Sequence, residues 1–224
     1  RVVPEDAGRD RHVGGRLDRA LADARPPVLF LRSFYADYES FAVTGRPEDA
    51  QEPPLLDAAT WSSEGVVCRV LWEIGPVVAV GYPGDKLPEP RGAVRLYVGG
   101  PDWQRAVVEL LRGCGLVVIK AGDGPGLWWE MARIVEEGCL AKTVIMFVDA
   151  DGYPFGMAAY QRFRERLLRE TQIDLPADGW NSWFAKFGDD GSVQFVRGER
   201  PMAGASDLRR RTKDLLRILT VPRA

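Results

Sequence analysis

The chain has 224 residues, of which 46% are hydrophobic and 28% are charged, close to the averages for globular proteins. This composition excludes a wholly disordered chain and a collagen-like repeat, and a chain of this length can bury a core without disulfides. Lysine and arginine number 30 against 32 acidic residues, a net charge of −2. A dedicated nucleic-acid-binding domain usually carries a basic excess, so none is expected here.

Short apolar runs mark the predicted strands in the first half of the chain. Residues 28–31 and 77–80 are continuously apolar, as expected for strands that are covered on both faces. Between them, apolar residues on one face predict a helix over 60–74, which a glycine-proline pair ends. A shorter run at 94–98 is predicted to be an edge strand.

The middle of the chain continues this alternation of strands and helices. Asp102 is predicted to cap a helix, and the next strand covers 116–119. A glycine-rich turn at 122–126 leads to a helix over 127–137 and then to a strand at 144–148. This alternation predicts an α/β fold with a flavodoxin-like parallel sheet of about five strands and helices on both faces.

The pattern changes near the C-terminus. A helix is predicted over 157–171, and an Asp-Gly turn between strand-like runs at 182–187 and 192–196 indicates a β-hairpin. A last helix is predicted over 206–219. The sequence therefore adds a C-terminal helix and β-hairpin extension to the parallel sheet.

Three regions follow from these elements: a polar, partly helical segment over 1–26, an α/β domain over 27–150, and a C-terminal region over 151–224 packed on the same domain. The chain contains no run of about 18 apolar residues and no signal peptide. We therefore expect a cytoplasmic protein. A location at the cytoplasmic face of a membrane would require segments outside this chain.

Histidine and cysteine limit the chemistry that can be expected. The single histidine, His12, lies in the polar N-terminal segment, which argues against Ser-His-Asp and Cys-His mechanisms. The cysteines Cys68, Cys114 and Cys139 lie far apart in the sequence, in or beside apolar runs. They lack the spacing of a zinc site and are predicted to be buried free thiols in a reducing compartment, and no metal site is predicted.

Polar residues at strand ends are the first candidates for a site, because open parallel sheets bind ligands beyond the carboxyl ends of their strands. Arg32, Ser33 and Asp37 follow the first strand, and Asp123 lies in the glycine-rich turn. Arg32 could bind a phosphate group or pair with an acidic side chain, and the sequence leaves both alternatives open.

Glu130 is the candidate catalytic residue. It lies on the flank of the apolar face of the helix over 127–137, beside Trp128 and Trp129. A carboxylate there could stabilise a developing sugar cation, as in glycosidic chemistry. The alternative is an acidic residue that only favours a helix N-terminus. The two tryptophans either stack on a base or belong to the core.

Two stretches resemble TIR domains. Residues 30–37, Phe-Leu-Arg-Ser-Phe-Tyr-Ala-Asp, resemble the opening strand and loop of that family, with its hydrophobic-Ser-aromatic-x-x-Asp signature. The stretch from Trp103 through the strand at 116–119 to 126–130, Gly-Leu-Trp-Trp-Glu, resembles the family's helix, strand and "S-x-W-C-x-x-E-L" sequence. The resemblance covers 27–148 and is nearest to a bacterial TIR-like group.

The resemblance implies an effector or signalling domain of bacterial defence that binds NAD and, as an enzyme, hydrolyses its nicotinamide–ribose bond. Glu130 would be the catalytic carboxylate. The predicted substrate-binding residues are Arg32, Ser33, Phe34, Asp37, Asp123, Trp128 and Trp129. No cofactor is expected, because NAD would be the substrate, and self-association would complete the site.

Two alternatives remain open. The first is a non-catalytic TIR-like module for interaction or nucleotide sensing, tethered to a membrane through segments outside this chain. The second is a base- or nucleoside-transferring enzyme, because nucleoside deoxyribosyltransferases share the architecture and a similarly placed glutamate. A nucleotide is the expected small-molecule partner in each case.

Overall fold

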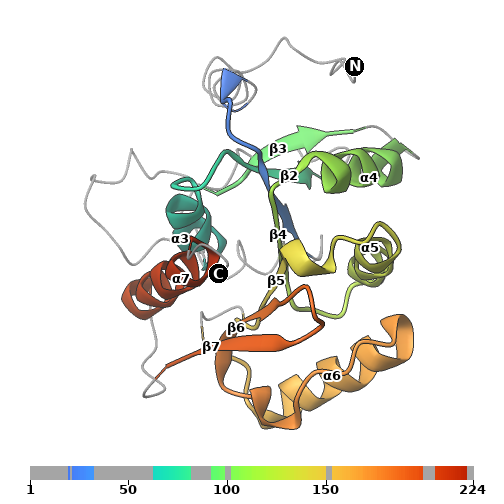
Figure 1. The fold of residues 1–224 in the computed structure, drawn as a ribbon, viewed down its shortest axis with the longest axis vertical. Helices are drawn as coiled ribbons and strands as arrows, with labels where there is room; N and C mark the ends of the chain where they lie inside the picture. The colour runs from blue at the N-terminus through green and yellow to red at the C-terminus, as the bar shows by residue number, and fades with distance from the viewer. Residues whose placement is uncertain are drawn as a thin grey trace, which may run out of the picture.

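A seven-stranded sheet forms the centre of the molecule, in the order β3-β2-β1-β4-β5-β6-β7 (Figure 1). The computed structural model describes residues 20, 22–32, 63–81, 92–98, 102–149, 153–198 and 205–220. The strands are β1 Val28–Leu31, β2 Val77–Gly81, β3 Val94–Tyr97, β4 Leu116–Lys120, β5 Thr143–Met146, β6 Ser182–Phe187 and β7 Val193–Arg197. The first five strands pair in parallel, and β6 and β7 pair antiparallel.

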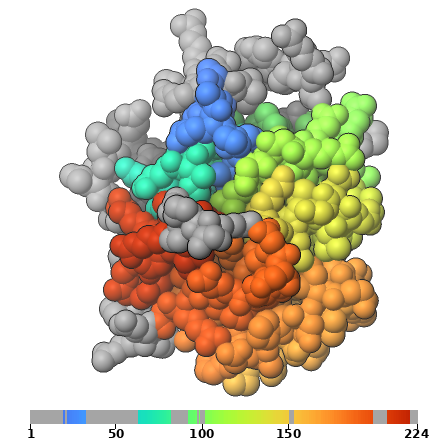
Figure 2. Space-filling view, in the orientation of Figure 1, coloured from blue at the N-terminus to red at the C-terminus, as the bar shows by residue number. Residues whose placement is uncertain are grey.

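Helices cover both faces of this sheet. The α-helices are α3 Ser63–Leu71, α4 Trp103–Gly113, α5 Pro125–Glu136, α6 Met157–Thr171 and α7 Ala205–Thr220, with short 3-10 helices η3 Leu140–Lys142 and η4 Ala177–Gly179. Figure 1 shows α3 and α7 together on one side of the sheet and α4, α5 and α6 on the other. The C-terminal elements, orange to red, form the lower part of the face seen in Figure 2.

The continuous apolar strands are explained by two cores, one on each face of the sheet. Leu29 and Leu31 of β1 join the core beneath α4, α5 and α6. Val28 and Phe30 join the core beneath α3 and α7. Because successive side chains of a strand point to opposite faces, a strand covered on both sides must be apolar at every position.

The predicted fold class is confirmed: the chain is an α/β protein with a mostly parallel sheet between helices. The short strand β3 lies at the edge, as predicted, and pairs with β2 (Val80 opposite Leu96). Its position gives the first five strands the order 3-2-1-4-5, whereas a flavodoxin-like order would insert this strand between β1 and β4.

The C-terminal hairpin extends the same sheet. Its strand β6 pairs antiparallel with β5, with Ala185 opposite Ile145. The Asp-Gly turn forms as predicted, with Gly191 at a φ of 78°, a backbone conformation that glycine adopts without a steric penalty. The hairpin therefore continues the core on both faces instead of forming a separate unit.

Some predicted helix boundaries shift. The helix predicted from 127 begins at Pro125, a residue type favoured at the first helical position. The described part of the helix predicted over 60–74 ends at Leu71 and continues as a turn. Asp102 stands before α4, but its side chain makes no capping hydrogen bond. Within the described ranges, no helix has the length and apolar character needed to cross a bilayer.

Candidate functional site

The strand order reverses between β1 and β4, and the carboxyl ends of these strands are the expected ligand position of an open parallel sheet. Leu31 of β1 pairs with Ile119 of β4, so the next residues, Arg32 and Lys120, are neighbours at this edge. Both belong to the set of strand positions that face α3. The fold therefore places two cationic side chains side by side where the order reverses.

Four polar residues of the α3 side join Arg32 there. Glu64 lies in the first turn of α3, and its Oε2 is 2.5 Å from Nη1 of Arg32. Its Oε1 is 3.8 Å from Nη2 of Arg95 in β3. Nζ of Lys120 donates a hydrogen bond of 3.3 Å to Oγ of Ser63. We call Arg32, Ser63, Glu64, Arg95 and Lys120 the α3-side cluster.

The α3-side cluster is deeply placed. The side chains of Arg32, Glu64 and Arg95 are 10%, 7% and 3% exposed. A Cβ at Gly92 would lie 2.7 Å from Oε1 of Glu64, so this glycine permits a close approach of backbone and carboxylate. Two guanidinium groups thus flank one carboxylate in the first turn of α3, and the ammonium group of Lys120 is bonded to the neighbouring Ser63. A helix N-terminus itself carries a partial positive charge.

On the opposite face of the sheet, Glu130 is one of the buried residues of α5. Glu130 is 2% exposed. Within the described part of the chain, its Oε2 has no hydrogen-bond partner. Burial raises the pKa of Glu130 to about 8. The carboxyl group is therefore mostly protonated at neutral pH, which is how a protein tolerates a buried acid without a cation beside it.

The two predicted tryptophans pack in different directions from α5. Trp128 lies 5.3 Å from Phe163 of α6, between ring centroids, and the Arg166 guanidinium lies 4.6 Å above its ring. Trp129 lies 4.9 Å from Trp103 of α4. Each ring fills the space between α5 and one neighbouring helix.

The remaining predicted site residues are placed as follows. Asp123 is exposed in the turn before α5, and its backbone carbonyl accepts a hydrogen bond of 3.2 Å from Arg166. Ser33, Phe34 and Asp37 lie outside the described residues. Arg32 lies on the α3 side of the sheet, whereas Glu130 and the tryptophans lie on the α5 side.

Four members of the α3-side cluster were not among the predicted site residues: Ser63, Glu64, Arg95 and Lys120. Lys120 is the polar residue that ends an apolar strand, and the rule that selected Arg32 could also have selected Lys120. Glu64 has the same signal as Glu130, an acidic residue near the start of a helix after a strand. Arg95 gives no such signal, because only the sheet register brings it close to Glu64.

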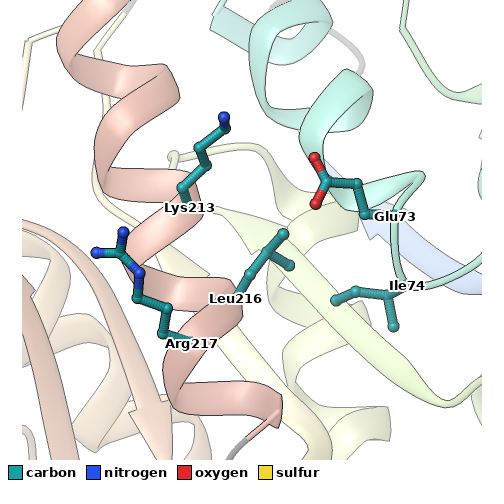
Figure 3. Close-up of a pocket in the computed structure, with 5 residues that line it drawn as sticks. All are labelled: Glu73, Ile74, Lys213, Leu216 and Arg217. Atoms are coloured by element: carbon teal, nitrogen blue, oxygen red, sulfur yellow. The ribbon is translucent and has the colours of Figure 1, made fainter.

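A hollow lies at the other end of the sheet from the α3-side cluster. It has a volume of about 390 Å³ and is formed by the end of α3 and by α7 (Figure 3). Its lining residues are Glu73, Ile74, Lys213, Leu216 and Arg217. The hollow adjoins the amino end of β2, opposite the edge where parallel sheets bind ligands, so it is not our candidate site. No group of three or more potential metal ligands occurs within the described ranges.

Comparisons with known proteins do not assign the chain to a family. No family model and no curated protein matches it. Among solved structures, the C-terminal domain of the coenzyme A biosynthesis bifunctional protein CoaBC matches at 11% identity and a TM-score of 0.41, over 89% of this chain and 98% of that chain. A mutant PPC decarboxylase complexed with pantothenoylaminoethenethiol matches at 16% identity and a TM-score of 0.34, over 86% and 99%. Likenesses this distant carry no functional argument.

The TIR prediction is wrong. No TIR family model matches, and the two structures named above are not TIR domains. The quoted motifs are strand, turn and helix patterns that recur in doubly wound sheets, which explains the misleading resemblance. NAD hydrolysis, a role in bacterial defence and the TIR-like interaction module are therefore withdrawn. The expectation that no cofactor is needed, with NAD as substrate, had the same basis and is withdrawn with them.

Proposed function

We propose that this domain binds a small molecule carrying a phosphate group at the carboxyl edge of the sheet, between β1 and β4. The observation that supports the proposal is the convergence of Arg32, Arg95 and Lys120 at the N-terminus of α3. Arginine and lysine are the side chains that recognise phosphate, and helix N-termini favour anions.

The geometry assigns different roles to these side chains. Glu64 ion-pairs with Arg32 and lies close to Arg95, so it holds both guanidinium groups in place near the strand ends. Lys120 ends β4, and its Nζ donates a hydrogen bond to Oγ of Ser63, so its ammonium group lies at the same helix end as Glu64. We therefore infer that Lys120 contacts the ligand and that Glu64 positions the arginines.

A nucleotide is the ligand class that we propose within the phosphorylated compounds. Doubly wound sheets bind nucleotides at the point where the strand order reverses, and this chain has the required edge.

We further propose a cytoplasmic location. The free thiols of Cys68, Cys114 and Cys139 support it, because reducing compartments keep cysteines in this form.

Calorimetric titration with adenosine monophosphate, inorganic phosphate and adenosine tests the proposal. We expect the two phosphate-containing compounds to bind and adenosine to bind much more weakly. In Lys120→Gln, the Kd for adenosine monophosphate should rise roughly 10- to 100-fold, because a charge-assisted hydrogen bond contributes about 1.5–3 kcal/mol.

Lys213→Gln is the matched control, because it removes an exposed lysine of α7 at the other end of the sheet. It should leave the Kd unchanged. Failure of both phosphate compounds to bind, or equal affinity in Lys120→Gln and the unmodified protein, would refute the proposal.

A further inference from the structure

Two cysteines that are distant in sequence meet at the end of α4. Cys114 directly follows α4, and Cys139 directly precedes η3. Both thiols donate to one oxygen, the backbone carbonyl of Leu111, with Sγ–O distances of 3.5 Å for Cys114 and 3.6 Å for Cys139. The two sulfur atoms can therefore be no farther apart than the sum of these distances. A disulfide needs a sulfur–sulfur distance of about 2 Å, so the two side chains would have to rotate toward each other.

An ammonium group lies at the same place. Nζ of Lys142 donates hydrogen bonds of 2.7 Å to the carbonyl of Leu111 and 2.9 Å to that of Cys114. Burial raises the pKa of the Cys114 thiol, and the positive charge of Lys142 opposes that rise. A nearby cation favours the thiolate, which is the form that reacts with oxidants.

The other charged groups at these two helix ends neutralise each other. Arg112 and Glu137 form a two-point ion pair with distances of 2.7 and 2.9 Å. This pair already joins the end of α4 to the end of α5. Lys142 is therefore the charged side chain that contacts the backbone of both Leu111 and Cys114, beside the two thiols.

The third cysteine provides an internal contrast. Cys68 lies in α3, in the core on the opposite face of the sheet. Burial raises the pKa of its thiol well above the usual value. All three cysteines are free and buried, but only Cys114 and Cys139 share a contact atom in the described part of the chain.

We propose that Cys114 and Cys139 form a redox-sensitive pair that hydrogen peroxide converts to an intramolecular disulfide. The Cys114 thiolate attacks one peroxide oxygen, which forms an S–O bond, breaks the O–O bond and releases hydroxide that becomes water. The Cys139 thiolate then attacks the resulting sulfenic sulfur, forms the S–S bond and releases the second oxygen as water. Two thiols lose two protons and two electrons, and one peroxide becomes two water molecules.

The disulfide would tie the end of α4 to the segment between α5 and β5. The closed loop would contain β4 and α5, and so the elements that carry Lys120 and Glu130. A cross-link of this kind stabilises the folded state mainly by restricting the unfolded chain. We expect the oxidised protein to show a Tm about 5 °C or more above that of the reduced protein.

Peptide mapping tests the proposal directly. The folded protein is treated with hydrogen peroxide, its remaining thiols are alkylated under denaturing conditions, and it is digested with trypsin without reduction. Trypsin should release Cys114 in residues 113–120 and Cys139 in residues 134–142. We expect these two peptides to be linked, with a mass two hydrogen atoms below their sum, and to separate on reduction. Cys68 should be found alkylated, because its thiol should stay reduced during the peroxide treatment.

The variants sharpen this test. Cys114→Ser and Cys139→Ser should each abolish the link. Lys142→Gln should slow its formation at pH 7 and move the pH profile of oxidation upward, because a neutral amide no longer favours the Cys114 thiolate. Lys142→Arg should restore the profile. Oxidation without the link between 113–120 and 134–142, or links to Cys68 or between molecules, would overturn the proposal.

Discussion

Two glutamates lie in helices on opposite faces of the sheet and are buried in different ways. Glu64 lies in the first turn of α3, and Glu130 lies in the middle of α5. Glu64 contacts the arginines Arg32 and Arg95. Glu130 has no cation beside it in the described structure, and its pKa is raised by burial. One acid is compensated by opposite charge, and the other is compensated by a proton.

The difference predicts opposite consequences of removing each acid. Without Glu64, two buried guanidinium groups would lose their shared carboxylate, which is costly in a low-dielectric environment. Within the described residues Glu130 has no cationic partner, so replacing its carboxyl group breaks no ion pair there, and the cost of holding a proton at high pH disappears. The two faces of one sheet thus respond in opposite directions to the same chemical change.

The largest expected effect is that of Glu64→Gln. Breaking one side of a buried ion pair typically lowers the free energy of unfolding by about 3–5 kcal/mol. Urea denaturation at pH 7 measures this value. Glu136→Gln, on the exposed surface of α5, is the control and should change stability little. A loss below about 1 kcal/mol in Glu64→Gln would mean that Glu64 is not needed to balance the arginines.

The next effect concerns the pH dependence set by Glu130. Its pKa of about 8 in the folded protein exceeds the ordinary 4.5, so the folded state holds a proton that the unfolded state releases between these values. Stability therefore falls by about 1.4 kcal/mol for each pH unit from 4.5 to 8, on the order of 3 kcal/mol by pH 7. Glu130→Gln should lack this loss.

Urea denaturation at pH 5 and pH 8.5 checks the sign. The wild-type protein should be clearly less stable at pH 8.5 than at pH 5, and Glu130→Gln should be the more stable of the two proteins at pH 8.5. Parallel pH profiles for the two proteins would show that Glu130 ionises normally in the folded state.

A smaller effect is expected at Gly92, which touches Glu64. An added Cβ would lie 2.7 Å from Oε1, a carboxylate atom held near two arginines. We expect Gly92→Ala to lower the free energy of unfolding by about 1–3 kcal/mol. Gly113→Ala, where nothing lies within 4 Å of the added Cβ, should cost nothing. Equal effects of the two substitutions would mean that Glu64 can move aside freely.

The smallest effect concerns a cation on the Glu130 side. The Arg166 guanidinium lies 4.6 Å above the Trp128 ring, and its Nε lies 3.8 Å from Oε1 of Glu170 on the same helix. Arg166→Gln should cost about 0.5–1 kcal/mol. Arg162→Gln, which removes an exposed arginine of the same helix, is the control. If both variants lose the same stability, the ring contact contributes nothing.

The sequence predicted most of the fold because the relevant signals are local. Continuous apolar runs located β1, β2, β4 and β5, and the Asp-Gly turn located the hairpin. Strand order could not be read in the same way. The local sequence around residues 94–97 does not predict that this strand pairs with β2, because strand pairing depends on contacts between segments far apart in the chain.

The candidate site was predicted less well for the same reason. The rule that ligands bind at strand ends selected Arg32 and the edge at which we propose the site. The partners of Arg32 come from α3 and β3, which pairing and packing bring together. Sequence position cannot tell which face of the sheet a residue will share, so Arg32 and Glu130 were assigned to one site although they lie on opposite faces.

The packing of α7 against α3 has a consequence for synthesis on the ribosome. One face of the sheet, with Val28 and Phe30 of β1, shares a core with side chains from α7, the last helix of the described chain. This face therefore stays partly uncovered until α7 has left the ribosome. The other face receives α4, α5 and α6 earlier. The nascent chain should thus depend on chaperones, or on rapid synthesis as far as α7, to protect its α3 side.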